Sequence, residues 1–101
     1  MHLINTSFHA AKPIANAIIG DVRTILMPLM TGSSLFTDIV MAEILVEVDP
    51  DCMSFTLQGK ADDLDKAMEW FQHEGQEFFN GLHRRYGHNV VYFTTPMRII
   101  Q

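Results

Sequence analysis

The sequence predicts an α+β fold whose elements follow the order strand–helix–strand–strand–helix–strand. In two runs, His2–Ala10 and Met53–Gly59, mainly apolar and mainly polar positions alternate with the period of two that is typical of half-buried strands. A third stretch, Ala61–Gly87, repeats apolar residues every three or four positions, as an amphipathic helix does. The turn sequence Asp-Pro-Asp at Asp49–Asp51 joins two strand-like runs into a hairpin.

Composition indicates one folded domain, residues 1–101, because 48% of the residues are apolar and 19% are charged. The net charge of −5 and the lack of a basic stripe argue against nucleic acid as a partner. Cys52 is the only cysteine, so no intrachain disulfide is expected. We find no signal-peptide pattern, and the longest apolar run, Ile39–Val48, is too short to span a bilayer. The sequence therefore predicts a cytoplasmic protein with no membrane partner.

The first strand and the first helix can be justified from their patterns. The strand directs Ile4, Thr6 and Phe8 to one face, while the opposite face carries Leu3, Asn5, Ser7 and His9. Pro13 then suits the first turn of a helix. The predicted apolar stripe of this helix consists of Ile14, Ile18, Val22, Ile25 and Leu29. We expect Pro28 to kink or shorten the helix near its end.

The second and third strands form the predicted hairpin. The second strand covers Ile39–Val48, with a wholly apolar face of Val40, Ala42, Ile44, Val46 and Val48. Its other face is mixed and consists of Met41, Glu43, Leu45 and Glu47. The third strand sends Met53, Phe55 and Leu57 one way and Ser54, Thr56 and Gln58 the other.

The long amphipathic segment is predicted as one helix that begins after Asp62 as N-cap and ends at Gly87 in a left-handed conformation. Its core-facing residues are Leu64, Ala67, Met68, Phe71, Gly75, Phe78, Leu82 and Tyr86. Trp70 is expected at the rim of the core. Asn89–Ile100 follows as the fourth strand, in which Pro96 indicates an edge or a bulge.

These elements predict a ferredoxin-like βαββαβ fold, with two helices on one face of a four-stranded antiparallel sheet. The first and third strands lie side by side at the centre. The uncovered face then carries polar residues on the central strands, flanked by Met41, Leu45 and Tyr92. Because such a face is too apolar to remain wholly in water, we expect a homodimer formed through it.

Three segments carry a resemblance to a known family: LINTSFHA, LMPLMTGSSLFTD and MEWFQHEGQEFFNGLHRRYGHNVVYFTT. They resemble the small bacterial proteins of domain-of-unknown-function family 4286, and the similarity is densest over Met68–Thr95. The first helix departs from the family pattern, with the plainer IANAIIGDVRTIL. The resemblance implies a dimeric α/β-barrel assembly of ferredoxin-like subunits, but it implies no reaction.

The leading candidate for a ligand-binding site is a set of polar residues on the central strands: Asn5, Ser7, His9, Ser54, Thr56 and Gln58. Within this set, His9 and Asn5 are the candidate catalytic residues. His9 would act as the acid/base toward an enolate-like ligand, and Asn5 would orient it. The alternative is that the same residues line a wet dimer interface with satisfied hydrogen bonds.

Other polar residues have plainer interpretations. Glu43 and Glu47 lie roughly 13 Å apart along a strand, too far for paired-carboxylate catalysis, and are interpreted as charges that protect an edge strand. No histidine pair has a metal-ligand spacing, so no metal and no cofactor are predicted. Cys52 has no base nearby in the sequence and is not predicted to be a nucleophile. Arg84 and Arg85 are interpreted as cations that suit the C-terminal end of a helix and not as an anion site.

Three functions remain open from the sequence. The first is a homodimeric α/β-barrel protein that binds a small molecule at its sheet face. The second is a cofactor-independent monooxygenase or isomerase that acts on a small aromatic or enolisable substrate. The third is a regulatory module that meets another protein through a sheet edge.

Overall fold

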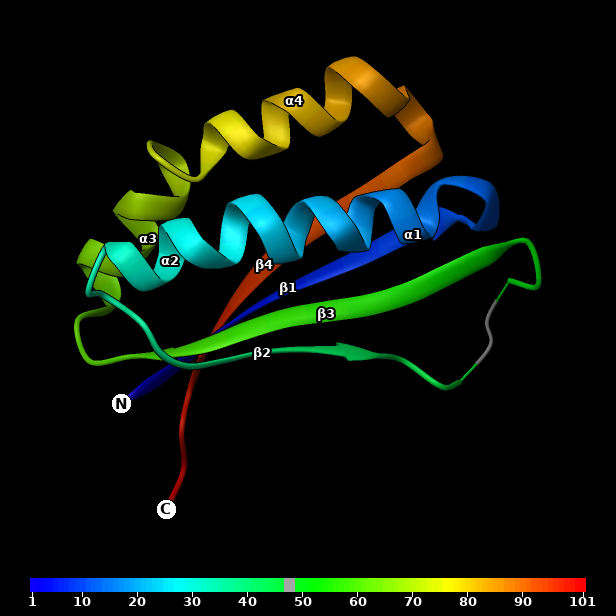
Figure 1. Cartoon of the computed structure of the whole chain (residues 1–101). Coiled ribbons are helices and arrows are strands. Elements are labelled where there is room, and N and C mark those ends of the chain that lie inside the picture. Colours follow the sequence, from blue (N-terminus) through cyan, green and yellow to red (C-terminus); the bar gives the residue numbers. More distant parts are fainter. Residues whose placement is uncertain (47–48) are drawn as a thin grey trace.

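Four antiparallel strands form one sheet with helices on one of its faces in the computed structural model, which describes residues 1–46 and 49–101 (Figure 1). The sheet order is β2-β3-β1-β4. Its strands are β1 (His2–Ala11), β2 (Thr37–Glu43), β3 (Cys52–Ala61) and β4 (Val90–Arg98). The helical segments are α1 (Lys12–Asp21), η1 (Val22–Leu26), α2 (Met27–Gly32), α3 (Leu64–Gln72), α4 (Gln76–Tyr86) and η2 (Gly87–Asn89). This architecture confirms the predicted ferredoxin-like fold.

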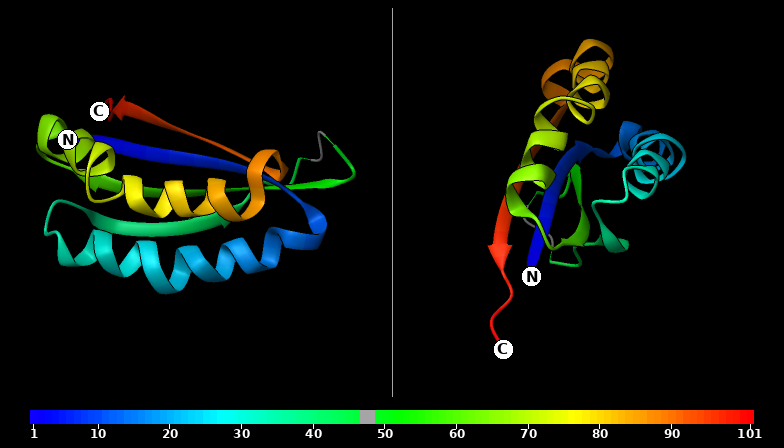
Figure 2. Two further views of the ribbon diagram at one scale, coloured as in Figure 1. Left: turned by 90° about the horizontal axis from the view of Figure 1, so that it is seen from above. Right: turned by 90° about the vertical axis from the view of Figure 1, so that its left-hand side faces the viewer.

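The two views in Figure 2 show two layers, a twisted sheet and a helical layer in which α1–α2 and α3–α4 form two arms. No helix of the described residues covers the other face of the sheet, which we call the open face. The core lies between the layers, where Phe8 of β1 and Phe55 of β3 stack with ring centroids 4.8 Å apart. Ile4, Thr6 and Phe8 are buried as predicted, so the alternation of β1 was interpreted correctly.

The predicted stripe of the first helix is wrong in its second half. Ile25 and Leu29 are 44% and 48% exposed, while Leu26 and Met30 are buried. The reason is η1, a π-helical turn in which the Met27 N–H donates to the Val22 carbonyl oxygen. This wider turn keeps side chains four residues apart on one line, namely Ile18, Val22, Leu26 and Met30. Pro28 does not shorten the helix, which continues to Gly32, and the irregular turn η1 lies just before this proline.

The long segment after β3 forms two helices, α3 and α4, where the sequence predicted one. The chain breaks between them at Gly75, whose N–H donates to the Trp70 carbonyl oxygen at 2.9 Å. A β-carbon at Gly75 would lie 3.0 Å from the Trp70 ring, so the break lets the backbone pack on that ring. Trp70 is itself a core residue and not a rim residue, at 6% exposed. The N-cap is Asp63 and not Asp62, since Asp63 accepts a hydrogen bond from the Lys66 N–H at 3.0 Å.

The faces of β2 are the reverse of the prediction, and the strand is shorter. Met41 packs toward the core, whereas Val40 lies on the open face beside Gln58. One extra residue enters β2 between Thr37 and Val40, and such a bulge exchanges the two faces of a strand. β2 ends at Glu43, and the last two residues of the predicted strand, 47–48, lie outside the described residues.

The last strand lies where the sequence predicted it, although β4 covers Val90–Arg98 and ends two residues before the predicted end at Ile100. β4 is an edge strand, which suits Pro96 because proline cannot donate a ladder hydrogen bond. Gly87, which ends α4, has the positive φ of 55° that favours glycine, but its ψ of −129° differs from the left-handed helix cap that the sequence predicted.

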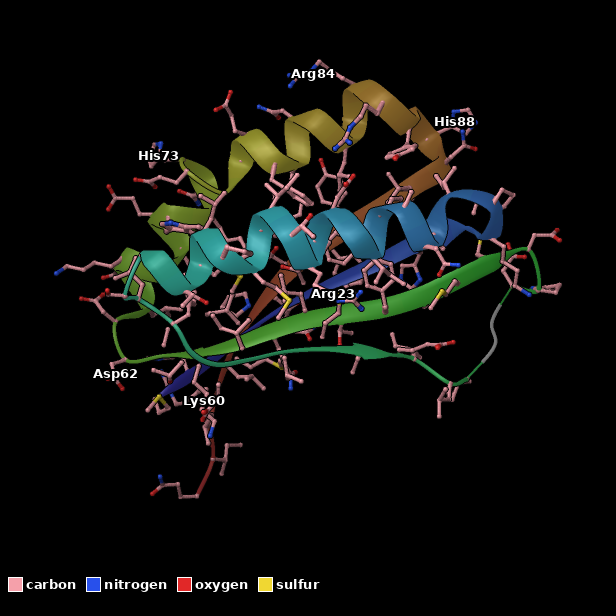
Figure 3. All side chains as sticks on the ribbon, viewed as in Figure 1. Arg23, Lys60, Asp62, His73, Arg84 and His88 are labelled. Carbon is pink, nitrogen blue, oxygen red and sulfur yellow. The ribbon has the colours of Figure 1, made fainter. Side chains whose placement is uncertain are left out.

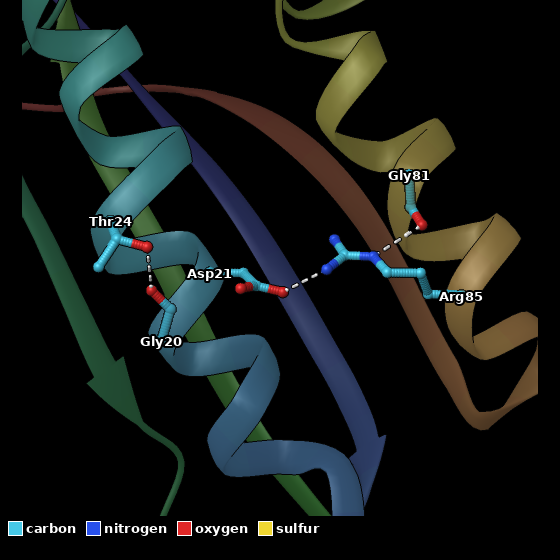
Figure 4. A network of polar contacts seen from close by, with 5 residues as sticks. All are labelled: Gly20, Asp21, Thr24, Gly81 and Arg85. Carbon is cyan, nitrogen blue, oxygen red and sulfur yellow. Dashed lines mark hydrogen bonds and ion pairs between the residues drawn. The ribbon is translucent and has the colours of Figure 1, made fainter.

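The two helical arms are also joined by a polar contact on their outer side (Figure 4). Arg85 donates to the Asp21 carboxylate at 2.9 Å and to the Gly81 carbonyl at 3.3 Å, which links α4 to α1. By length and composition alone, the continuous helix Lys12–Gly32 could cross a membrane. Here, however, its buried side chains pack against the sheet as those of a core helix do.

Candidate functional site

The six predicted ligand-binding residues form three cross-strand pairs at the centre of the open face. The antiparallel register of β1 and β3 places three side chains of one strand beside three of the other: Asn5 with Gln58, Ser7 with Thr56, and His9 with Ser54. We call these six residues the polar ladder. All six are half-buried in the single chain. The strict alternation of both strands is what brings them to one face.

Hydrogen bonds inside the polar ladder differ from the expected pairing. His9 Nδ1 lies 2.6 Å from Ser54 Oγ, and Asn5 Nδ2 donates to Ser7 Oγ at 3.1 Å. The imidazole is therefore held by a hydroxyl across the strands and not by the Asn5 amide. The His9 ring also stacks on Phe93 of β4, with centroids 6.1 Å apart and planes inclined by 29°.

This geometry defines what His9 can do chemically. An unprotonated Nδ1 would accept a hydrogen bond from the Ser54 hydroxyl, and a protonated Nδ1 would donate one to the Ser54 oxygen. Among the described residues, no hydrogen bond to His9 Nε2 is found, so this nitrogen is available to a ligand. A base with one oriented nitrogen and one available nitrogen can accept or deliver a proton.

The edge strands flank the polar ladder with apolar side chains that the sequence assigned incorrectly. On β4 these are Val91, Phe93 and Met97, and on β2 they are Val40 and Ala42. The expected flanking residues lie elsewhere: Met41 and Tyr92 pack on the helix side, and Leu45 is exposed beyond the end of β2. The Tyr92 hydroxyl donates to the Phe79 carbonyl of α4 at 3.3 Å, which fixes it on that side.

Sequence reasoning could not have chosen the flanking residues of β4. Both alternations of this strand, Val90–Tyr92–Thr94 and Val91–Phe93–Thr95, have the same mixture of residue types. The pairing register with β1 decides between them, because it places Phe93 opposite Ser7 and Val91 opposite His9.

Charged groups near the polar ladder lie at its ends. Lys60 projects from the sheet away from the helices (Figure 3) and pairs with the Asp38 carboxylate at 3.2 Å. At the other end, burial and the nearby Asp49 carboxylate raise the pKa of the Cys52 thiol above its usual value, which disfavours the nucleophilic thiolate. Glu43 is exposed at the end of β2, and its proposed companion Glu47 lies outside the described residues.

Metal-ligating side chains do not converge in the part of the chain that the structure describes. No group of three or more histidine, cysteine or acidic side chains could hold an ion there. His73 and His88 lie at opposite ends of the α4 region, on the side of the molecule remote from the open face (Figure 3).

The surface beside the polar ladder is open. A hollow of about 230 Å³ reaches one end of it, lined by residues that include Lys12, Cys52 and Ser54. A larger hollow of about 330 Å³ lies on the helical side around Trp70 and His73. The polar ladder thus lies on an open face and is not enclosed within the part of the chain that the structure describes.

Solved structures share this fold at low sequence identity. A protein provisionally assigned as an antibiotic biosynthesis monooxygenase from Deinococcus radiodurans has a TM-score of 0.68 and 15% identity, over 100% of this chain and 94% of that one. An ethyl tert-butyl ether d (ethd) family protein from Bacillus halodurans C-125 has a TM-score of 0.63 and 11% identity, over 94% and 97%. A dimeric ferredoxin-like protein from an uncultured marine organism has a TM-score of 0.67 and 6% identity, over 100% and 96%.

No curated protein matches the chain. A family model described as "Domain of unknown function (DUF4286)" matches residues 1–100, in agreement with the resemblance of the three sequence segments. The chain therefore belongs to this family of unknown function.

Proposed function

We propose that the protein is a homodimer that pairs through the open faces of two copies and binds a small molecule at the polar ladder. One observation carries the proposal: polar side chains occupy the central strands, whereas the edge strands carry exposed apolar ones. Val91 and Phe93 on β4 are 56% and 53% exposed, and Val40 on β2 is 47% exposed. Apolar rows of this extent are typical of surfaces that a partner covers.

The size of the open face supports a second copy as the partner. The four strands are about 4.8 Å apart, and the central strands have 10 residues each with a rise of about 3.3 Å per residue. The open face is therefore on the order of 19 by 33 Å. Its flat area, on the order of 600 Å² before side-chain relief is counted, approaches the roughly 800 Å² per partner of a standard interface. One of the solved structures with this fold is described as dimeric.

The side chains of the edge strands indicate how two copies would meet. β4 carries the larger ones, Phe93 and Met97, and β2 carries the smaller ones, Val40 and Ala42. A two-fold axis parallel to the strands places β4 of one copy over β2 of the other, so that large side chains meet small ones and the gap between the sheets stays even. A two-fold axis parallel to the sheets but perpendicular to the strands would instead place β4 over β4, so that large side chains would meet large ones.

The proposed dimer would bury the polar ladders of both copies between two apolar margins. Buried donors and acceptors need partners, because an unpaired one costs about 1–3 kcal/mol. Water or a small molecule in the middle of the interface would supply these partners. We place this dimer in a reducing compartment such as the cytoplasm, since its lone Cys52 needs no disulfide partner.

An enzymatic function is the second candidate, and the His9–Ser54 contact of 2.6 Å favours it. A positioned imidazole can act as acid/base for a cofactor-independent monooxygenase or isomerase reaction. His9→Ala should then abolish turnover while the dimer remains intact. Turnover that survives in this variant would remove His9 from the catalytic role.

The oligomeric state tests the main proposal. Light scattering should show a dimer for the wild type and a monomer for Phe93→Glu, because the new carboxylate would be buried without a counter-charge. Leu29→Glu is the matched control, since Leu29 is 48% exposed but lies on the helical side and should not affect the dimer. A monomeric wild type, or a dimer disrupted only by Leu29→Glu, would overturn the proposal. Native mass spectrometry of the wild-type dimer would detect a bound molecule.

A further inference from the structure

We infer that the polar ladder selects an uncharged molecule that carries both hydrogen-bond donors and acceptors, such as a primary amide. This inference rests on the proposed dimer and adds the chemical class of its ligand. It follows from three features of the open face: the absence of fixed charge on the ladder, the kinds of polar group that remain available, and the apolar side chains beside them.

The first feature is charge. The polar ladder consists of two amides, three hydroxyls and one imidazole, and none of these is an ammonium, guanidinium or carboxylate. The two lysines near the ladder lie at its ends: Lys60 pairs with Asp38 at 3.2 Å at one end, and Lys12 lines the hollow beside Ser54 at the other. An amidinium buried over the ladder would lose its water without gaining a counter-charge, and a carboxylate would have only the His9 imidazole as a possible one, so burial of either ion is costly. An uncharged molecule avoids this cost.

The second feature is the set of available groups. Gln58 and Asn5 lie opposite each other in the register, and each carries an amide with both a carbonyl oxygen and N–H donors. Asn5 uses one N–H for Ser7, and among the described residues Gln58 makes no side-chain hydrogen bond. The two amides together offer donors and acceptors side by side. A ligand amide presents the complementary pair, whereas a carboxylate only accepts and an amidinium only donates.

The third feature is the apolar margin. Phe93 projects on the open face, where its ring stacks on that of His9 at 6.1 Å. This aromatic surface would contact the apolar part of a ligand while the amides bind its polar part. A small aromatic amide has both parts, so benzamide is a suitable probe.

The test uses three probes of the same shape that differ in charge: benzamide, benzoate and benzamidine. Each is titrated into the isotopically labelled chain, and the backbone amide signals of β1 and β3 are followed by NMR. We expect benzamide to shift the signals of the ladder residues and to bind at least about tenfold more tightly than either ion. Equal or tighter binding of benzoate or benzamidine would overturn the inference, as would a failure of all three to bind.

A single isosteric change provides the control. Gln58→Glu replaces an amide by a carboxylate on the ladder and should shift the preference from benzamide to benzamidine. Gln72→Glu makes the same change on the exposed surface of α3 and should leave the preference unchanged. If both variants keep the wild-type preference, the ladder is not the site and the inference fails. Light scattering on the same samples separates this failure from a failure of the dimer itself.

Discussion

The break between α3 and α4 makes a prediction in which two glycines respond to the same change with opposite sign. At Gly75, an added β-carbon would lie 3.0 Å from Trp70 Cζ3 and 3.2 Å from Phe71 Cα. Trp70 cannot move away easily, because it also packs edge-on against Phe36 at 5.4 Å. Gly75 has φ −70°, which is ordinary for alanine, so the cost of Gly75→Ala is steric and not conformational. At Gly81, the nearest atoms are 3.8 Å away, an ordinary van der Waals distance, and belong to the side chains of Arg84 and Arg85.

The magnitudes follow from these contacts. Overpacking costs typically about 1–3 kcal/mol, and replacing a helical glycine by alanine returns about 0.5–1 kcal/mol. Gly75 is the N-cap of α4 and not a helix-interior residue, so Gly75→Ala receives no such gain and should lower the free energy of unfolding by about 1–3 kcal/mol. Gly81→Ala, inside α4, should raise it by about 0.5–1 kcal/mol. Urea unfolding followed by Trp70 fluorescence, at one fixed protein concentration, measures both values. If Gly75→Ala stabilised the protein as Gly81→Ala does, close packing on Trp70 would not be the reason for the break.

Two further predictions concern the start of α3 and the single thiol. Asp63→Ala should lower the free energy of unfolding by about 1 kcal/mol, because the hydrogen bond from the Lys66 N–H is lost. Asp62→Ala should change this free energy by less than about 0.5 kcal/mol. Equal effects of the two substitutions in urea unfolding would contradict the assignment of Asp63 as the N-cap. Because burial and Asp49 raise the pKa of the Cys52 thiol, its thiolate fraction at pH 8 should be low and iodoacetamide should alkylate it more slowly than free cysteine. Asp49→Asn should speed the reaction, and an unchanged rate would show that the carboxylate is not a cause.

The parts of the fold that could be predicted are those where one local pattern has one interpretation. β1 and β3 alternate strictly, so their faces and the six residues of the polar ladder followed directly. The element order then restricted the topology to the ferredoxin-like arrangement, which the sheet order confirms. The place of the ladder on the open face thus follows from the sequence pattern of β1 and β3, whereas its ligand is a proposal.

The errors have a common cause, since each depends on a contact that the local pattern does not contain. One extra residue in β2 reversed its faces, and one π-turn at Val22–Leu26 moved the buried stripe of the first helix. The break at Gly75 depends on the position of Trp70 in the core. A period measured along the sequence assumes regular geometry, and it therefore fails wherever packing makes an irregular turn or bulge favourable.

The sequence by itself determined the order of the elements and the polar character of the central strands, because alternation and turn chemistry act between near neighbours in the chain. Only the tertiary structure decided which side chains flank the polar ladder. Phe93 reaches His9, and Val40 reaches Gln58, through strand registers that join residues far apart in sequence. Those registers are set by hydrogen bonds and packing across the whole sheet, and no single segment specifies them.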